Sequence, residues 1–398
     1  MQLLTQEKVW NVVNSRNQQP PRPSLRRGRG VLQLLAVLLA TSVVACSGGT
    51  PSAAPSGSGS FRPTGSMAQA RESQTATLLA DGRVLIAGGE DKEVTLASAE
   101  IYDPATGLFT PTGSMTTPRM WATATLLKDG DVLIAGGSNN SDFLLASAEL
   151  YHPTTGTFLA TGSMKVARFN HTATLLADGR VLVAGSSGYE VLASAEVYDP
   201  ATGVFSPTGS MTTPREWATA TLLNDGRVLV AGGEGQGPSP LLSAELYDPT
   251  KGTFAPTGNM SIGHYGGTAT LLKSGRVLVA GGLEETVDTA VAETFDPSSG
   301  TFTAVGSMLT AGDSFEATLL NDGTVLLSGG GYEDANGPHT LASTEFFAPN
   351  TSQFRAGPVM ASKRDGHSAV LLQDGRVLVL GGGDGTGATL SSAELYEP

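Results

Sequence analysis

The chain of 398 residues contains a single cysteine, Cys46. One cysteine cannot form an intrachain disulfide bond or supply a cluster of cysteine ligands to a metal ion, so the sequence predicts neither. Basic residues are also scarce, because 24 lysines and arginines stand against 37 aspartates and glutamates. A basic stripe is the electrostatic footprint of nucleic-acid binding, and beyond residue 45 the sequence shows none. We therefore expect no nucleic acid among the partners.

Long apolar runs are absent as well. The apolar run at residues 31–45 is shorter than the roughly 20 residues of a membrane-spanning helix. It follows Arg26, Arg27 and Arg29 and ends in small residues, a pattern typical of a secretory signal. We predict a signal peptide with a long leader over residues 1–45.

The end of this run, Val43-Val44-Ala45-Cys46, resembles the lipobox of bacterial lipoproteins. The resemblance implies that Cys46 is lipidated and becomes the first mature residue; ordinary signal cleavage and an uncleaved anchor are the alternatives. Residues 46–60 consist almost entirely of Gly, Ser, Pro and Ala, a composition that gives a flexible tether. The expected location is the bacterial cell envelope, with the chain exported and anchored to a membrane through Cys46, or secreted.

Glycine is abundant. The 51 glycines follow no three-residue period, which excludes collagen. Self-similarity with a period of about 20 to 50 residues indicates a repeat architecture. A Gly-Gly doublet recurs with such a period, and at Gly185 only one glycine of the pair is kept. We therefore predict seven repeats over residues 61–398. The doublets begin at Gly88, Gly136, Gly232, Gly281, Gly329 and Gly381.

Residues 75–115 contain one representative repeat. A β-prone run at 75–79 is followed by Asp81-Gly82, which predicts a tight turn. Residues 84–87 are apolar at every position, as expected for a strand covered on both faces. A third strand is expected at 99–102 and a fourth at 108–111, where a closing proline favours an edge position. Each repeat is therefore predicted to form a four-stranded antiparallel sheet with its last strand outermost.

The doubled glycine, Tyr102-Asp103-Pro104 and Phe109 resemble the kelch repeat, in which tryptophan usually stands at the place of Phe109. The resemblance implies an all-β fold, a seven-bladed kelch-type β-propeller. Residues 59–67 match residues 107–115, whereas the chain stops after the third strand of the last repeat. We therefore predict that the N-terminal strand closes the last blade.

Strand direction places the loops on two faces. Turns between strands one and two, and three and four, are nearly invariant, whereas the other loops differ in every repeat. We expect any protein or glycan ligand to bind on the face that carries these differing loops, which we call the variable face. The alternative is that these loops differ in sequence because nothing constrains them. Flat aromatic faces suit sugar rings or protein side chains, and the alternative is that these aromatics pack the loop bases. The candidate binding residues are Trp121, Trp217, Tyr265, Phe169, His171, His264, His367, Arg119 and Arg215.

Charged positions follow the repeat too. Glutamate recurs in the third strand, from Glu100 to Glu394, and arginine recurs before the first strand, from Arg71 to Arg364. We expect these residues to form partly buried pairs. In two repeats His264 and Gly312 replace the arginine, so their glutamates test whether backbone amides are the true partners. Acidic loop residues are expected to be solvated, and these are Glu284, Glu285, Asp288, Glu333 and Asp334.

An enzyme is the second possibility. Some kelch propellers are copper-radical oxidases resembling galactose oxidase, which need a cysteine cross-linked to tyrosine; others are sugar mutarotases. Cys46 belongs to the lipobox, and His171 and His367 have no histidine neighbour at their position in an adjacent repeat. We therefore predict no metal and no cofactor. The prediction is a non-enzymatic envelope module that binds protein or glycan; the alternative is a carbohydrate-active enzyme, oxidase- or mutarotase-like.

Overall fold

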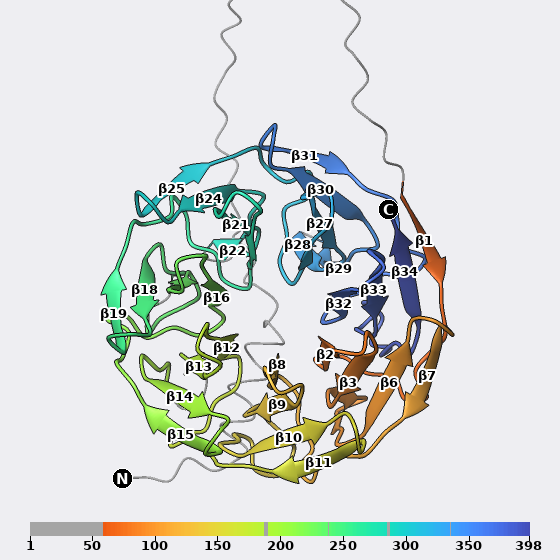
Figure 1. Cartoon of the computed structure of the whole chain (residues 1–398). Helices are drawn as coiled ribbons and strands as arrows, with labels where there is room; N and C mark the ends of the chain where they lie inside the picture. The colour runs from red at the N-terminus through yellow and green to blue at the C-terminus, as the bar shows by residue number, and fades with distance from the viewer. Residues whose placement is uncertain (1–58, 187–189, 238, 285–286, 335) are drawn as a thin grey trace, which may run out of the picture. The chain divides into compact units, whose positions relative to one another are not determined.

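The computed structural model describes residues 59–186, 190–237, 239–284, 287–334 and 336–398. The chain divides into two units, Met1–Ser56 and Gly57–Pro398. The predicted signal peptide, Cys46 and the tether up to residue 58 lie outside the described residues. Within the second unit, seven four-stranded antiparallel sheets stand radially around a central axis (Figure 1). The predicted all-β, seven-bladed propeller is confirmed.

The first four blades follow one another in chain order, and in each blade the chain runs from the inner to the outer strand. Blade one contains β2 (Thr75–Leu78), β3 (Val84–Ala87), β6 (Ala99–Asp103) and β7 (Leu108–Pro111). Blade two contains β8 (Thr123–Leu126), β9 (Val132–Ala135), β10 (Ala148–His152) and β11 (Thr157–Ala160). Blade three contains β12 (Thr172–Leu175), β13 (Val181–Ala184), β14 (Ala195–Asp199) and β15 (Val204–Pro207). Blade four contains β16 (Thr219–Leu222), β17 (Val228–Ala231), β18 (Ala244–Asp248) and β19 (Thr253–Pro256).

The last three blades complete the ring. Blade five contains β20 (Thr268–Leu271), β21 (Val277–Ala280), β24 (Ala292–Asp296) and β25 (Thr301–Ala304). Blade six contains β26 (Glu316–Leu319), β27 (Val325–Ser328), β30 (Thr344–Ala348) and β31 (Gln353–Ala356). Blade seven contains β32 (Ser368–Leu371), β33 (Val377–Leu380), β34 (Ala393–Glu397) and, as its outer strand, β1 (Ser60–Pro63).

The N-terminal strand closes the ring, as predicted. Strand β1 pairs antiparallel with β34, which sets Phe61 opposite Tyr396. The two ring centroids lie 5.4 Å apart. An aromatic pair joins the third and fourth strands of each of the other blades, as Tyr102 and Phe109 do at 4.7 Å, although blades five and six pair two phenylalanines. Phenylalanine therefore supplies the packing anchor for which kelch repeats usually have tryptophan.

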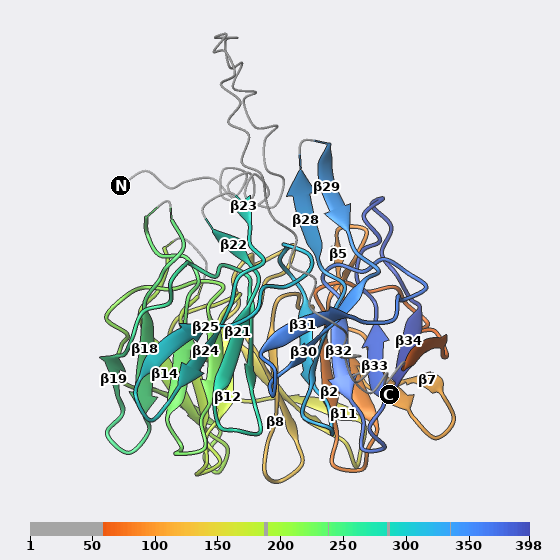
Figure 2. The same ribbon diagram turned by 90° about the horizontal axis from the view of Figure 1, so that it is seen from above.

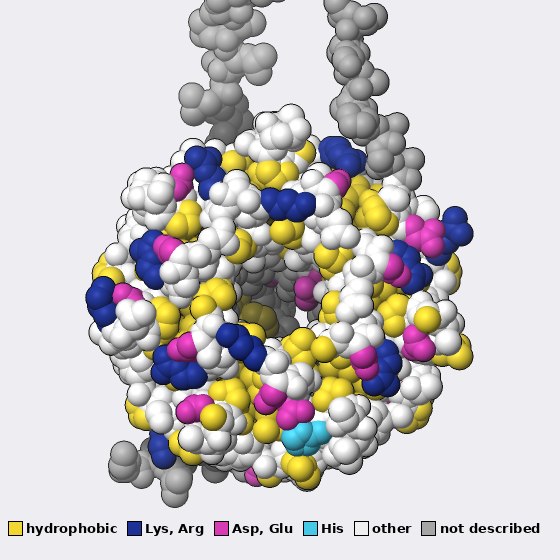
Figure 3. Space-filling model, in the orientation of Figure 1, with side chains coloured by type: hydrophobic (Ala, Val, Ile, Leu, Met, Phe, Trp, Pro, Cys, Tyr) yellow, Lys and Arg dark blue, Asp and Glu magenta, His cyan; other side chains and the backbone are white. Residues whose placement is uncertain are grey.

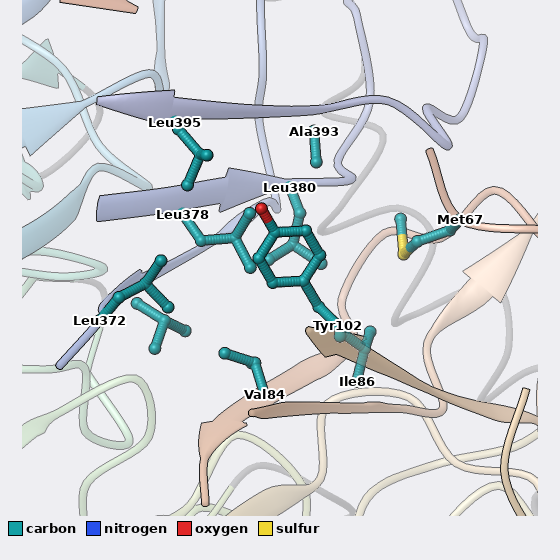
Figure 4. Close-up of a cluster of buried hydrophobic side chains, with 10 residues drawn as sticks. Met67, Val84, Ile86, Tyr102, Leu372, Leu378, Leu380, Ala393 and Leu395 are labelled. Carbon is teal, nitrogen blue, oxygen red and sulfur yellow. The ribbon is translucent and has the colours of Figure 1, made fainter. Parts of the chain in front are cut away.

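The hydrophobic core is divided among the blade interfaces. Seven clusters of buried side chains each join residues of two neighbouring blades. In the cluster between blades seven and one, Leu378 and Leu395 pack with Val84, Ile86 and Tyr102 (Figure 4). Every residue of β3 is buried, because this strand is covered on both faces. Since each blade completes its neighbour's core, the stability of the ring depends on closure.

The Gly-Gly doublet has a steric origin. Gly88 and Gly89 have φ values of 68° and 86°. A Cβ on Gly88 would lie 2.3 Å from the carbonyl oxygen of Arg119, in the next blade. The amide of Gly89 donates to that same oxygen over 2.8 Å. The doublet thus ends strand two where the following blade approaches too closely for any side chain.

The two faces of the propeller differ in structure. On the variable face, loops between second and third strands add three short hairpins, made by β4 (Glu90–Asp91) with β5 (Val94–Thr95), β22 (Leu283–Glu284) with β23 (Val287–Asp288), and β28 (Gly331–Asp334) with β29 (Gly337–Thr340). Figure 2 shows these hairpins on one side, with β28 and β29 projecting farthest. Figure 3 shows the opposite face, where basic and acidic side chains lie side by side around a central opening. Within the described part of the chain, no helix is long and apolar enough to cross a bilayer.

Candidate functional site at the channel mouth

In five blades, the arginine before the first strand supports the variable face from inside the blade. Arg71 donates through Nη1 to the carbonyl oxygens of Gly88 and Ser98, over 2.9 and 2.8 Å. Its Nη2 lies 3.3 Å from Glu100 Oε1. Burial lowers the pKa of Arg71, while Glu100 acts in the opposite direction. The predicted arginine–glutamate pairs are confirmed in five blades, the other four being Arg119–Glu149, Arg168–Glu196, Arg215–Glu245 and Arg364–Glu394.

Backbone amides are the partners that all seven glutamates share. Glu100 accepts from the amides of Ala68 and Gln69, and six other glutamates make equivalent contacts in their blades. Glu345 keeps two such bonds, each of 2.8 Å, although Gly312 replaces the arginine of its blade. The glutamate therefore holds the connection between blades, and the arginine is an additional partner.

Three of the predicted binding residues belong to this internal layer. Arg119 and Arg215 are each 1% exposed, as is His264. His264 takes the arginine position of blade five, where Nδ1 lies 2.6 Å from the carbonyl oxygen of Gly281 and Nε2 lies 3.6 Å from Glu293. The structure thus places these side chains inside the blades, where they support the surface above them.

His171 and His367 link neighbouring blades. His171 Nε2 lies 3.0 Å from the hydroxyl of Thr123 in blade two, and His367 Nε2 lies 3.3 Å from that of Ser328 in blade six. Burial, followed by the charge of the nearby arginine, lowers the pKa of each histidine to about 3. Both rings are therefore neutral at physiological pH. Gln74 occupies the same position in blade one and donates to Ser368 of blade seven.

The two residues that follow each arginine position encircle the propeller axis on the variable face, and we call this ring of residues the channel mouth. They stand one residue before the innermost strands, β2, β8, β12 and β16 among them (Figure 1). The second residue of each pair has positive φ, including Trp121 at 53° and Trp217 at 52°. The seven pairs are Glu72–Ser73, Met120–Trp121, Phe169–Asn170, Glu216–Trp217, Tyr265–Gly266, Asp313–Ser314 and Asp365–Gly366.

Backbone hydrogen bonds join neighbouring pairs around the mouth. The amide of Ser73 donates to the carbonyl oxygen of Gly366 over 3.0 Å, and the amide of Trp121 donates to that of Ser73 over 3.2 Å. On the other side, the amide of Ser314 donates to the carbonyl oxygen of Gly266 over 3.3 Å. These bonds place the side chains of successive blades next to one another, irrespective of their distance in sequence.

The predicted aromatic residues meet in pairs at the mouth. Trp121 and Phe169 have ring centroids 5.7 Å apart, and Phe143 approaches Phe169 at 6.2 Å. Trp217 and Tyr265 form the second pair, at 5.9 Å. Both tryptophans are half-buried whereas Phe169 is 2% exposed. The aromatics therefore pack on one another across blades and leave part of the tryptophan surface to solvent.

Carboxylates occupy the remaining blades of the mouth. Enclosure in the mouth raises the pKa of Glu72 to about 7, and the charges of Glu90, Asp365 and Asp91 add to this effect. Enclosure likewise raises the pKa of Asp313 to about 7, followed by the charges of Asp365 and Asp288. The pKa of Asp365, which acts on both groups, is raised by burial. Like charges thus oppose one another across blades six, seven and one.

Sequence reasoning missed this acidic set and named loop carboxylates instead. Glu284, Asp288, Glu333 and Asp334 lie in the hairpins, while Glu285 lies outside the described residues. Asp288 accepts from the amide of Glu333 over 2.7 Å, which ties two hairpins together. A separate pocket of about 380 Å³ lies beside β29, with His339, Lys363 and Asp384 in its lining. The missed residues share one repeat position, the residue after the arginine, and that shared position was the available signal.

Comparisons with known proteins agree with the fold. The Kelch motif model matches residues 73–116, which span blade one, and no curated protein matches the chain. One solved structure, described as a novel fungal alcohol oxidase of the AA5 family in complex with copper, superposes with a TM-score of 0.68. It is 17% identical, and the match covers 85% of this chain and 76% of that one. The chain is therefore a seven-bladed propeller whose first blade carries a Kelch motif.

Proposed function

We propose that this protein is a non-enzymatic binding module that engages its ligand at the channel mouth of the variable face. The observation that carries the proposal is the contrast between positions within one repeat. The buried glutamate and its backbone-amide contacts recur in all blades, whereas the mouth residues change from carboxylate to aromatic. Repeats under one structural demand stay alike, so the mouth serves something other than folding.

The proposal includes a location. A lipid anchor at Cys46 would hold the propeller at the bacterial cell envelope, with protein or glycan partners presented there. Replacing Cys46 by serine should move the full chain from the membrane fraction to the soluble fraction. Retention of the Cys46→Ser variant in the membrane fraction would contradict the anchor without affecting the proposed binding site.

A carbohydrate-active oxidase is the second candidate, because the propeller superposes on a copper-containing alcohol oxidase. At 17% identity this likeness shows the fold alone, and a fold does not determine an activity. Among the described residues, no group of three or more His, Cys, Asp or Glu side chains is arranged to hold a metal ion. The described residues therefore do not fit a metal centre built from these side chains.

The two candidates differ in a direct experiment. The full chain is screened against glycans and envelope proteins and is assayed in parallel for sugar oxidation and mutarotation. The binding function predicts saturable binding without turnover, and loss of binding in Trp217→Asn, which places the residue of blade three at the same position in blade four. Turnover that disappears when Glu72 or Asp313 is replaced by its amide would support the enzyme instead.

A further inference from the structure

The channel mouth has two chemically different parts. Blades six, seven and one contribute the carboxyl groups of Asp313, Asp365 and Glu72, which we call the acidic arc. Blades two to five contribute the two aromatic pairs, together with the buried carboxylate of Glu216 in blade four. The parts join where Trp121 bonds to Ser73 and where Ser314 bonds to Gly266. Each end of the acidic arc is therefore flanked by an aromatic residue.

The carboxyl groups of the acidic arc repel one another. The charges that act on Glu72 and Asp313 all come from carboxylates, and like charges held together disfavour ionisation. The neighbouring arginines are committed below the surface, as Arg71 and Arg364 are in their pairs with glutamate. A cation at the mouth would relieve this repulsion, and the chain's excess of acidic residues, a formal net charge of −13, would steer cations toward it.

The aromatic pairs suit the same kind of ligand. The faces of tryptophan and tyrosine rings attract ammonium and guanidinium groups within about 6 Å of the ring centroid. Trp121 and Trp217 occupy a left-handed backbone position at which other blades have glycine, serine or asparagine. A bulky side chain is unfavourable there, so folding alone does not account for tryptophan at these two places.

We propose that the channel mouth binds a positively charged peptide segment, with lysine or arginine side chains held between the acidic arc and the aromatic residues that flank it. This inference rests on the proposed binding function and specifies the chemistry of the partner. The carboxyl groups are distributed over three blades, which suits several cationic groups on one chain better than a single ion. A neutral sugar would satisfy the aromatic pairs and leave the carboxylates unneutralised.

Calorimetric titration of the full chain with tetralysine at pH 8 tests the proposal. Saturable binding is expected, and tetralysine acetylated on every side chain should not bind. Asp365→Asn removes the central carboxylate, and Trp121→Asn introduces the residue that blade three has at this position. Each variant should weaken tetralysine binding by roughly tenfold or more. The matched control Asp225→Asn removes one charge from the opposite face and should bind like the wild type.

The outcomes separate this inference from the proposed function. Absence of saturable tetralysine binding, or equal affinity in the wild type and Asp365→Asn, overturns the cationic partner. If the protein binds maltotetraose but not tetralysine, and Trp217→Asn abolishes the maltotetraose binding, the binding function is retained and the cationic ligand is rejected. Thermal melting checks folding: Asp365→Asn should melt at or above the wild-type temperature because it relieves repulsion. If that variant melts lower, Glu72→Gln replaces it as the decisive variant.

Discussion

Phe61 lies opposite Tyr396 in an antiparallel strand pair, with 5.4 Å between the ring centroids, although the two residues come from the first and last strands of the propeller. The β1–β34 pair is the contact that turns seven successive sheets into a ring. It also covers the edge of β34, which would otherwise present unpaired backbone groups.

Shortening the Phe61 side chain should therefore destabilise the whole propeller. Phe61→Ala is expected to lower the free energy of unfolding by about 2 kcal/mol, since the ring is half-buried. Urea denaturation followed by circular dichroism measures this change. The control is Arg62→Ala on the same strand, whose ion pair with Glu397 is exposed and whose loss should change stability by less than about 0.5 kcal/mol. Equal effects of the two variants would contradict closure by β1.

The buried arginine–glutamate pair gives a second prediction. Arg119→Met leaves Glu149 buried without its cationic partner and removes the bonds to Gly136 and Ser147. We expect a loss of about 3–5 kcal/mol in the free energy of unfolding. The double variant Arg119→Met, Glu149→Gln should recover part of this loss, as a double-mutant cycle would show. A loss below about 1 kcal/mol for Arg119→Met would mean that the amide contacts of Glu149 are sufficient by themselves.

Glu72 should destabilise the protein at high pH. Its pKa in the folded state, about 7, lies above the ordinary value of 4.5. The folded chain therefore retains a proton that the unfolded chain releases between these values, and stability falls as the pH rises through this window. Glu72→Gln removes the charge and should raise the free energy of unfolding by about 1–2 kcal/mol at pH 8, after allowance for solvent in the mouth, with little effect at pH 4.5.

A control of opposite sign accompanies that measurement. The hydrogen bond from Arg227 holds the pKa of Asp225 below its ordinary value, so ionised Asp225 stabilises the fold at neutral pH. Asp225→Asn should therefore lower the melting temperature slightly at pH 8. A rise in stability for both variants would point to net charge, and would contradict a local effect of the acidic arc.

His171 predicts a dependence on acid. Its pKa in the folded state is about 3, below the ordinary value of 6.5, so the unfolded chain binds a proton that the folded chain does not. Stability should fall as the pH falls from about 6.5 toward 3. Glutamine occupies the same position in blade one, as Gln74. The variant His171→Gln should therefore match the wild type at pH 8 and exceed it by about 2–3 kcal/mol at pH 4, by chemical denaturation. Equal stabilities at pH 4 would show that His171 titrates normally.

The architecture was predictable because local chemistry determines it. The turn at Asp81-Gly82 and the apolar strand at residues 84–87 recur with one period, and the match between residues 59–67 and 107–115 predicted closure. For Glu100 the sequence predicted an arginine partner, with backbone amides as the alternative, and the structure shows both. The sequence could not identify the amides as those of Ala68 and Gln69, because the connecting segment brings them near only in the fold.

The acidic arc was not predicted, and the reason is geometric. Glu72 and Asp365 stand almost 300 residues apart and become neighbours only because blade seven closes against blade one. Their position holds methionine, phenylalanine and tyrosine in blades two, three and five, and a buried glutamate, Glu216, in blade four, so no single repeat suggests an acidic site. The sequence analysis grouped the aromatic residues on the variable face, but their pairing across blades depends on the left-handed backbone before each inner strand.

Tryptophan emission during a tetralysine titration tests the central claim most directly. The chain has three tryptophans, Trp10, Trp121 and Trp217, so in a Trp10→Phe background both remaining residues report from the channel mouth. The predicted result is a saturable change in emission whose half-saturation equals that measured by calorimetry and which Asp365→Asn shifts to higher concentration. Saturable calorimetric binding with unchanged emission would place the ligand elsewhere and contradict the proposed site.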